Sequence, residues 1–92
     1  MKATILLMSD RHNDKDVETM AAVEEIIRDF REILTTSPEI MQMDDGNVLK
    51  FYVNCKDRSQ GHNLVKVFYA VLQRHGLMNG KAHNTGILIP EL

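Results

Sequence analysis

The chain has 92 residues, of which 43% are hydrophobic and 26% are charged, with a formal net charge of −2 and one cysteine. This length suffices for one domain with its own core and is too short for two. The composition excludes a disordered or fibrous chain, and the small negative charge gives no general attraction to nucleic acid or anionic lipid. A lone cysteine cannot form an internal disulfide, which favours a cytoplasmic location.

The chain begins with a short apolar run, Ala3 to Met8, that contains the β-branched residues Thr4 and Ile5. Such a run predicts a strand. It is too short for the apolar core of a signal peptide or for a membrane span, so we expect no membrane association.

The next segment, residues 17–34, has the apolar periodicity of an amphipathic helix. Asp14 or Asp16 can cap its start through a side-chain oxygen. The segment from Thr35 to Pro38 ends it, because proline cannot continue a helix. The expected buried stripe consists of Met20, Val23, Ile27, Phe30 and Leu34.

A hairpin is predicted next, from strands at residues 39–43 and 48–55. The Asp45-Gly46 pair between them can supply the positive φ angles of a tight turn. Because residues 39–43 form such a short run, the alternative that they are a loop beside a three-stranded sheet stays open.

A second helix is predicted over residues 64–75, with Leu64, Phe68, Val71 and Leu72 on one face. Gly76 is placed to adopt the left-handed conformation after the helix, and Leu77 would then contact Leu72, as in a Schellman motif. A last short strand is expected over residues 85–89, before Pro90.

The element order βαββαβ predicts one α+β domain, residues 1–92, with a ferredoxin-like fold. Its antiparallel sheet should have the strand order 4-1-3-2, with two helices on one face. RNA-binding domains of this topology stack bases on aromatic residues of the central strands, where this chain offers only Tyr52, so nucleic acid is disfavoured as a partner.

The face of the sheet away from the helices should be largely apolar. Alternation along the strands turns Phe51 and Val53 inward, and the outward positions are then Leu6, Met8, Met41, Met43, Val48, Lys50, Tyr52 and Leu88. A contiguous apolar face is seldom left in water, so we expect it to be covered by a second copy or by another protein.

Polar loop residues gather at two opposite edges of the predicted sheet, and each group is a candidate ligand site. One edge gathers His12, Asp14, Asp44, Asp45 and His83, donor types that suit a divalent metal, although no spacing specifies one. The other gathers Lys56, Arg58 and His62 at the start of the second helix, where free amides can receive an anion.

Cys55 and His62 are a third candidate, as a nucleophile and its base. Alternation places Cys55 with the buried residues of its strand, which argues against this role.

The leading hypothesis is therefore a non-enzymatic protein-interaction or regulatory module without a cofactor. A small bacterial or phage accessory or inhibitor protein that binds a larger target would fit, as would a homodimer. The alternatives are a sensor that binds a small ligand or metal at the histidine edge, and a small enzyme that uses Cys55 and His62.

Overall fold

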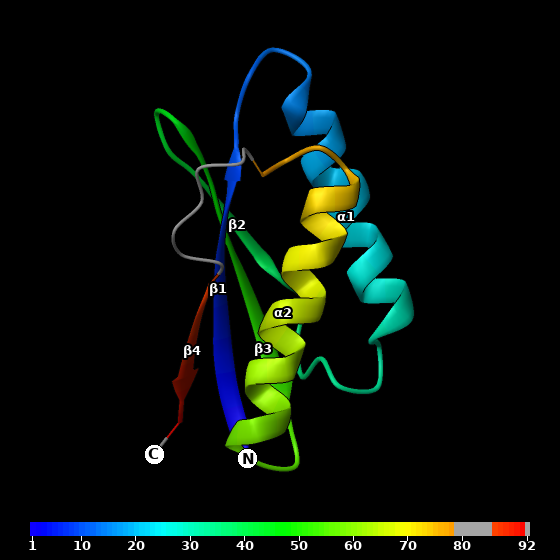
Figure 1. Ribbon diagram of the computed structural model, residues 1–92, viewed down its shortest axis with the longest axis vertical. Coiled ribbons are helices and arrows are strands. Elements are labelled where there is room, and N and C mark those ends of the chain that lie inside the picture. The colour runs from blue at the N-terminus through cyan, green and yellow to red at the C-terminus, as the bar shows by residue number, and fades with distance from the viewer. Residues whose placement is uncertain (79–85, 92) are drawn as a thin grey trace.

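A computed structural model describes residues 1–78 and 86–91, and these form a four-stranded antiparallel sheet with two helices on one face (Figure 1). The strands run in the order β2-β3-β1-β4, which is the predicted order read from the opposite edge of the sheet. The predicted ferredoxin-like α+β class is confirmed. The elements are β1 (Lys2–Asp10), α1 (Lys15–Asp29), β2 (Glu39–Gln42), β3 (Gly46–Asn54), α2 (Arg58–Arg74) and β4 (Ile87–Pro90).

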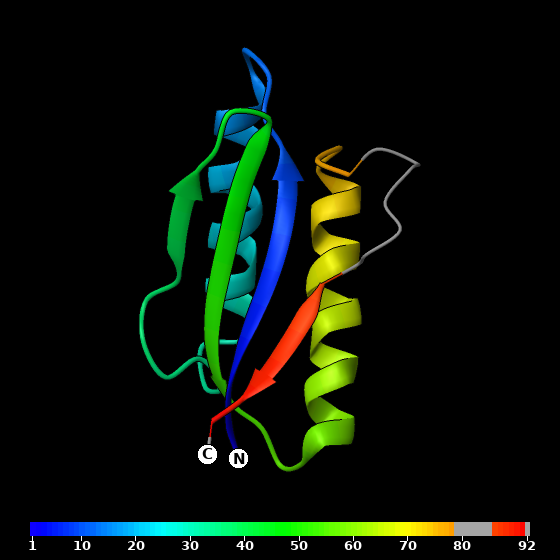
Figure 2. The ribbon, with the colours of Figure 1, turned by 90° about the vertical axis from the view of Figure 1, so that its left-hand side faces the viewer.

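The core lies between the sheet and the helices, and alternation along the two central strands builds it. Ile5 and Leu7 of β1 and Leu49, Phe51 and Val53 of β3 are buried on the helix side. The residues between them face the other way, where the sheet carries no helix (Figure 2). Side chains alternate along a strand, so one surface of the sheet is core and the other is exposed.

Helix α2 contributes the centre of this core. Phe68 is fully buried, and its ring meets the rings of Phe30 and Phe51 edge to face, with centroid distances of 5.1 and 5.0 Å. These contacts use the preferred geometry of aromatic pairs and add to the apolar area that each ring buries.

Helix α1 differs from the prediction at its end and in its buried face. It ends at Asp29, because Leu34 forms a β-bridge with Val53 and the N–H of Asn54 donates to the Ile33 carbonyl. Met20 is half exposed, and the neighbouring Thr19 is buried in its place with its hydroxyl donating to the Lys15 carbonyl. The hydrogen bond makes burial of the threonine hydroxyl tolerable.

The start of α1 also differs. Asp14 occupies the N-cap position, but its side chain makes no capping hydrogen bond. Asp16 does not cap the helix either, because its carboxylate accepts from the Asn47 amide and lies 3.5 Å from the Arg11 guanidinium.

Helix α2 ends as predicted. Gly76 has a φ of 71°, its N–H donates to the Gln73 carbonyl, and the N–H of Leu77 donates to the Leu72 carbonyl. Leu77 is fully buried. These two bonds and the hydrophobic contact define a Schellman motif, in which glycine tolerates the left-handed backbone.

The β2–β3 hairpin is present, so residues 39–42 are a strand and the loop alternative is wrong. Its turn is not built as predicted. In the described ranges, positive φ angles occur at Gly76 and Gly86, and Gly46 starts β3 in an extended conformation. The glycine is needed there for a different reason, because a β-carbon at Gly46 would lie 2.3 Å from the Ser9 carbonyl oxygen of β1.

Within residues 1–78 and 86–91, no helix is long and apolar enough to cross a membrane.

Candidate functional site

The sheet surface that faces away from the helices is the main candidate, and we call it the open face. The β1–β3 register pairs Met8 with Val48 and Leu6 with Lys50, and the β2–β3 register pairs Met41 with Val48. Cross-strand partners point to the same side of a sheet. The structure therefore places on the open face the predicted residues Leu6, Met8, Met41, Val48, Lys50 and Tyr52. Met43 continues the β2–β3 register on the same face, because its N–H donates to the Gly46 carbonyl.

The prediction for Leu88 is wrong. Leu88 pairs with the buried Ile5 and packs against the core, with its methyl groups beside Gly61 of α2. Its neighbours Ile87 and Ile89 pair with Leu6 and Thr4 and are exposed on the open face. A shift of one residue reverses the face of every side chain in a strand, and sequence alone did not fix the parity of this short one.

The apolar side chains of the open face form a diagonal strip across all four strands. It starts with Met41 on β2, continues through Val48 and Met8, and reaches Ile87 and Ile89 on β4. Figure 2 shows β2 and β4 at opposite edges of the sheet, with β3 and β1 between them. A shallow depression beside Met8 and Val48 is lined by Leu6, Leu7, Gly86 and Ile87.

Polar groups lie on one side of this strip and bond to one another. The Tyr52 hydroxyl donates to the Glu39 carboxylate at 2.8 Å, and this bond raises the pKa of Tyr52. Lys50 lies opposite Glu39 in the register. The open face thus has an apolar strip and a polar corner whose tyrosine hydroxyl already has a partner.

The predicted metal edge is not assembled by the described residues. His12 and Asp44 line one shallow surface depression together with Arg11, whose cation counts against a metal there. His83 lies outside the described residues. Within residues 1–78 and 86–91, no group of three or more His, Cys, Asp or Glu side chains is placed to hold a metal ion, so Asp14 and Asp45 join no such set.

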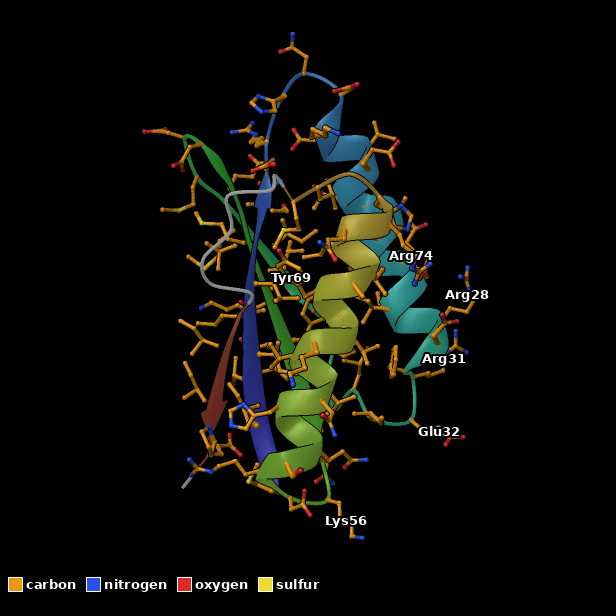
Figure 3. The ribbon with its side chains drawn as sticks, viewed as in Figure 1. Arg28, Arg31, Glu32, Lys56, Tyr69 and Arg74 are labelled. Atoms are coloured by element: carbon orange, nitrogen blue, oxygen red, sulfur yellow. The ribbon has the colours of Figure 1, made fainter. Side chains whose placement is uncertain are left out.

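The predicted anion site is already taken by a carboxylate of the chain. Asp57 caps α2, and its side chain accepts from the Gln60 N–H at 2.8 Å. Figure 3 shows Lys56 at the end of the molecule, pointing away from the helices. Arg58 and His62 are exposed. An incoming anion would meet the Asp57 charge where the free amides were expected.

Cys55 and His62 do not form a catalytic pair. The Cys55 side chain is 3% exposed, and its sulfur lies 3.5 Å from the Met1 carbonyl oxygen. His62 is on the surface of α2. As the alternation predicted, Cys55 packs as a small core residue.

A charged cluster joins the two helices, and the sequence did not predict it. His75 at the end of α2 lies 3.0 Å from one Glu25 oxygen through Nε2 and 3.6 Å from Glu18 through Nδ1. Arg74 forms an ion pair with the other Glu25 oxygen. The hydrogen bond from His75, followed by that from Arg74, lowers the pKa of Glu25. Pairing across helices requires the tertiary structure, so no local pattern reveals it.

We expect this cluster to make the free energy of unfolding depend on pH. A carboxylate with a lowered pKa in the folded state stabilises the fold above its unfolded pKa, and the contribution is lost as the pH falls through the folded value. Glu25→Gln should therefore be less stable than the wild type at neutral pH, and the two should converge as the pH falls through the lowered pKa of Glu25. Urea unfolding from pH 7 to pH 3 measures this.

The control is Glu24→Gln, an exposed neighbour on α1 that forms no ion pair with the described residues. Its difference from the wild type should stay small and constant with pH. A constant difference for Glu25→Gln as well would contradict the role of the cluster.

Comparison of the chain with protein-family models, with curated proteins and with solved structures finds no match. The candidate function therefore rests on the residues and geometry described above.

Proposed function

We propose that this protein is a non-enzymatic interaction module that binds another protein through its open face. One observation carries the proposal. Nine large hydrophobic side chains are exposed in the described residues, and five of them lie on this one surface: Met8, Met41, Met43, Ile87 and Ile89. The others are divided among the N-terminus and the two helices. A monomer rarely leaves such a contiguous apolar surface in water, because each Å² that a partner covers is worth about 25 cal/mol.

The type of side chain supports a protein as the partner. Three of the five are methionines, whose flexible thioethers adapt to the shape of an apolar surface. Among the described residues, the open face carries two cations, Lys2 and Lys50, and three carboxylates, Asp10, Glu39 and Glu91, so it has no net positive charge. An apolar face without net positive charge suits a protein surface better than a nucleic acid or an anionic lipid, both of which attract a net positive charge.

A photo-crosslinking side chain at Met41, compared with the same group at Met20, tests the proposal in cells of the source organism. Met20 is the matched control, since it is 50% exposed against 43% for Met41 and lies on α1 instead of on the open face. We expect discrete protein adducts from position 41 and none from position 20. Equal labelling from both positions, or none from position 41, would refute the open face as a binding surface.

A further inference from the structure

We propose that the outer edge of β2 binds an extended segment of a partner protein, which adds to the sheet as a fifth strand. This inference rests on the proposed function and adds the way in which the partner docks. β2 is an end strand of the sheet, and Figure 2 shows it at one side, next to β3. An end strand has a row of backbone groups that no strand of its own sheet can use.

The hydrogen bonds of the β2–β3 hairpin show which backbone groups of β2 face outward. The Met43 N–H donates to the Gly46 carbonyl at 2.8 Å. Bonded and non-bonded pairs alternate along an antiparallel ladder, so Ile40 and Gln42 turn their N–H and C=O groups away from β3. Within residues 1–78 and 86–91, neither residue has another backbone partner. Two donors and two acceptors at this spacing match the backbone of an extended chain.

The opposite edge of the sheet is less suited to such a segment. The Glu91 N–H donates to the Lys2 carbonyl at 2.9 Å, and the same alternation turns Leu88 and Pro90 of β4 outward. Proline has no N–H, so Leu88 carries the one outward donor within Ile87–Pro90. Proline and lysine on an edge strand hinder pairing with another chain. β2 contains neither residue, so its edge keeps both donors.

The side chains around this edge indicate the chemistry of the segment. Met41 and Met43 lie on the open face and are 43% and 45% exposed, so the residue beside them should be apolar. Asp44 and Asp45 in the adjoining turn are exposed, and neither forms an ion pair with a described residue. A basic residue at that end of the segment complements them. A second copy offers no basic residue in its own β2, so it fits this edge less well.

Selection of random peptides displayed on phage against the purified chain tests the edge. The selected peptides should alternate apolar residues and carry a net positive charge. Gln42→Pro should weaken their binding by at least about tenfold, because it removes an outward N–H and places a ring at the edge. The fold should persist, since that N–H has no partner in the hairpin. Gln42→Ala removes the same side chain but keeps the N–H, and should bind like the wild type.

Amide hydrogen exchange of the wild type with a selected peptide locates the contact without any variant, and so also serves if Gln42→Pro fails to fold. The N–H groups of Ile40 and Gln42 should exchange rapidly in the free protein and become protected when the peptide binds. The Met41 N–H faces Val48 within the hairpin, so its exchange is the internal control. A peptide held by side chains alone would leave the two outward amides unprotected.

Three results overturn the inference: selection of no peptide, equal binding by Gln42→Pro, or unchanged exchange at Ile40 and Gln42. The crosslinking experiment separates this failure from failure of the proposed function. Protein adducts from position 41, combined with any of these three results, would keep the open face as a binding surface and reject only the fifth strand.

Discussion

Phe68→Ala is expected to lower the free energy of unfolding by about 3–5 kcal/mol, the usual range for removal of a buried aromatic ring. Phe68 is fully buried, and its ring contacts Phe30 of the α1 C-cap and Phe51 of β3. The substitution therefore opens a cavity at the point where both helices meet the sheet. Urea unfolding followed by circular dichroism measures the loss.

The adjacent residue on α2 offers a matched control. Val67 is exposed, so Val67→Ala should change stability by less than about 1 kcal/mol. Phe30 is only partly buried, and Phe30→Ala should cost less than Phe68→Ala. A loss below about 1 kcal/mol for Phe68→Ala would mean that the ring is not at the centre of the core.

The parts of the fold that local chemistry controls were predictable. The end of α2 depends on a glycine and a leucine adjacent in sequence, and both Gly76 and Leu77 have the predicted conformation and burial. The alternation of Leu49, Phe51 and Val53 likewise predicted which side of β3 is core. In these cases the responsible residues are within a few positions of one another, so a short pattern contains the information.

The parts that depend on distant pairing were not predictable. Helix α1 stops at Asp29 because Leu34 bridges to Val53, a residue 19 positions away in the sequence. Leu88 faces the core because β4 pairs in one register with β1, and a shift by one residue would reverse it. Neither contact leaves a local pattern in the sequence.

The candidate sites show the same contrast between features set by nearby residues and features set by distant pairing. The open face was predicted except for its β4 residues, because β1 and β3 are long enough for alternation to be read. The anion site failed because Asp57, the residue before α2, caps the helix with its own carboxylate. The pairing of His75 with Glu25 joins two helices and was missed for that reason.

Gly46→Ala is expected to destabilise the fold by about 1–3 kcal/mol, the usual cost of overpacking. A β-carbon at Gly46 would lie 2.3 Å from the Ser9 carbonyl oxygen, a backbone atom of the neighbouring strand that cannot turn aside. The central strands would have to separate at the end where Asp10 pairs with Gly46. Amide hydrogen exchange should show the loss locally, with faster exchange near Ser9 and Asp10.

Gly61→Ala is the control for this clash. Its added β-carbon would meet Leu88 Cδ2 at 2.7 Å, the end of a flexible side chain, and alanine favours the helix at that position of α2. Gly61→Ala should therefore cost less than Gly46→Ala. If both variants lose the same free energy of unfolding, the backbone of β1 at Ser9 moves as readily as the Leu88 side chain, and the prediction is wrong. The same contact lies beside Met8 of the apolar strip, whose Cγ would be 3.8 Å from the added β-carbon.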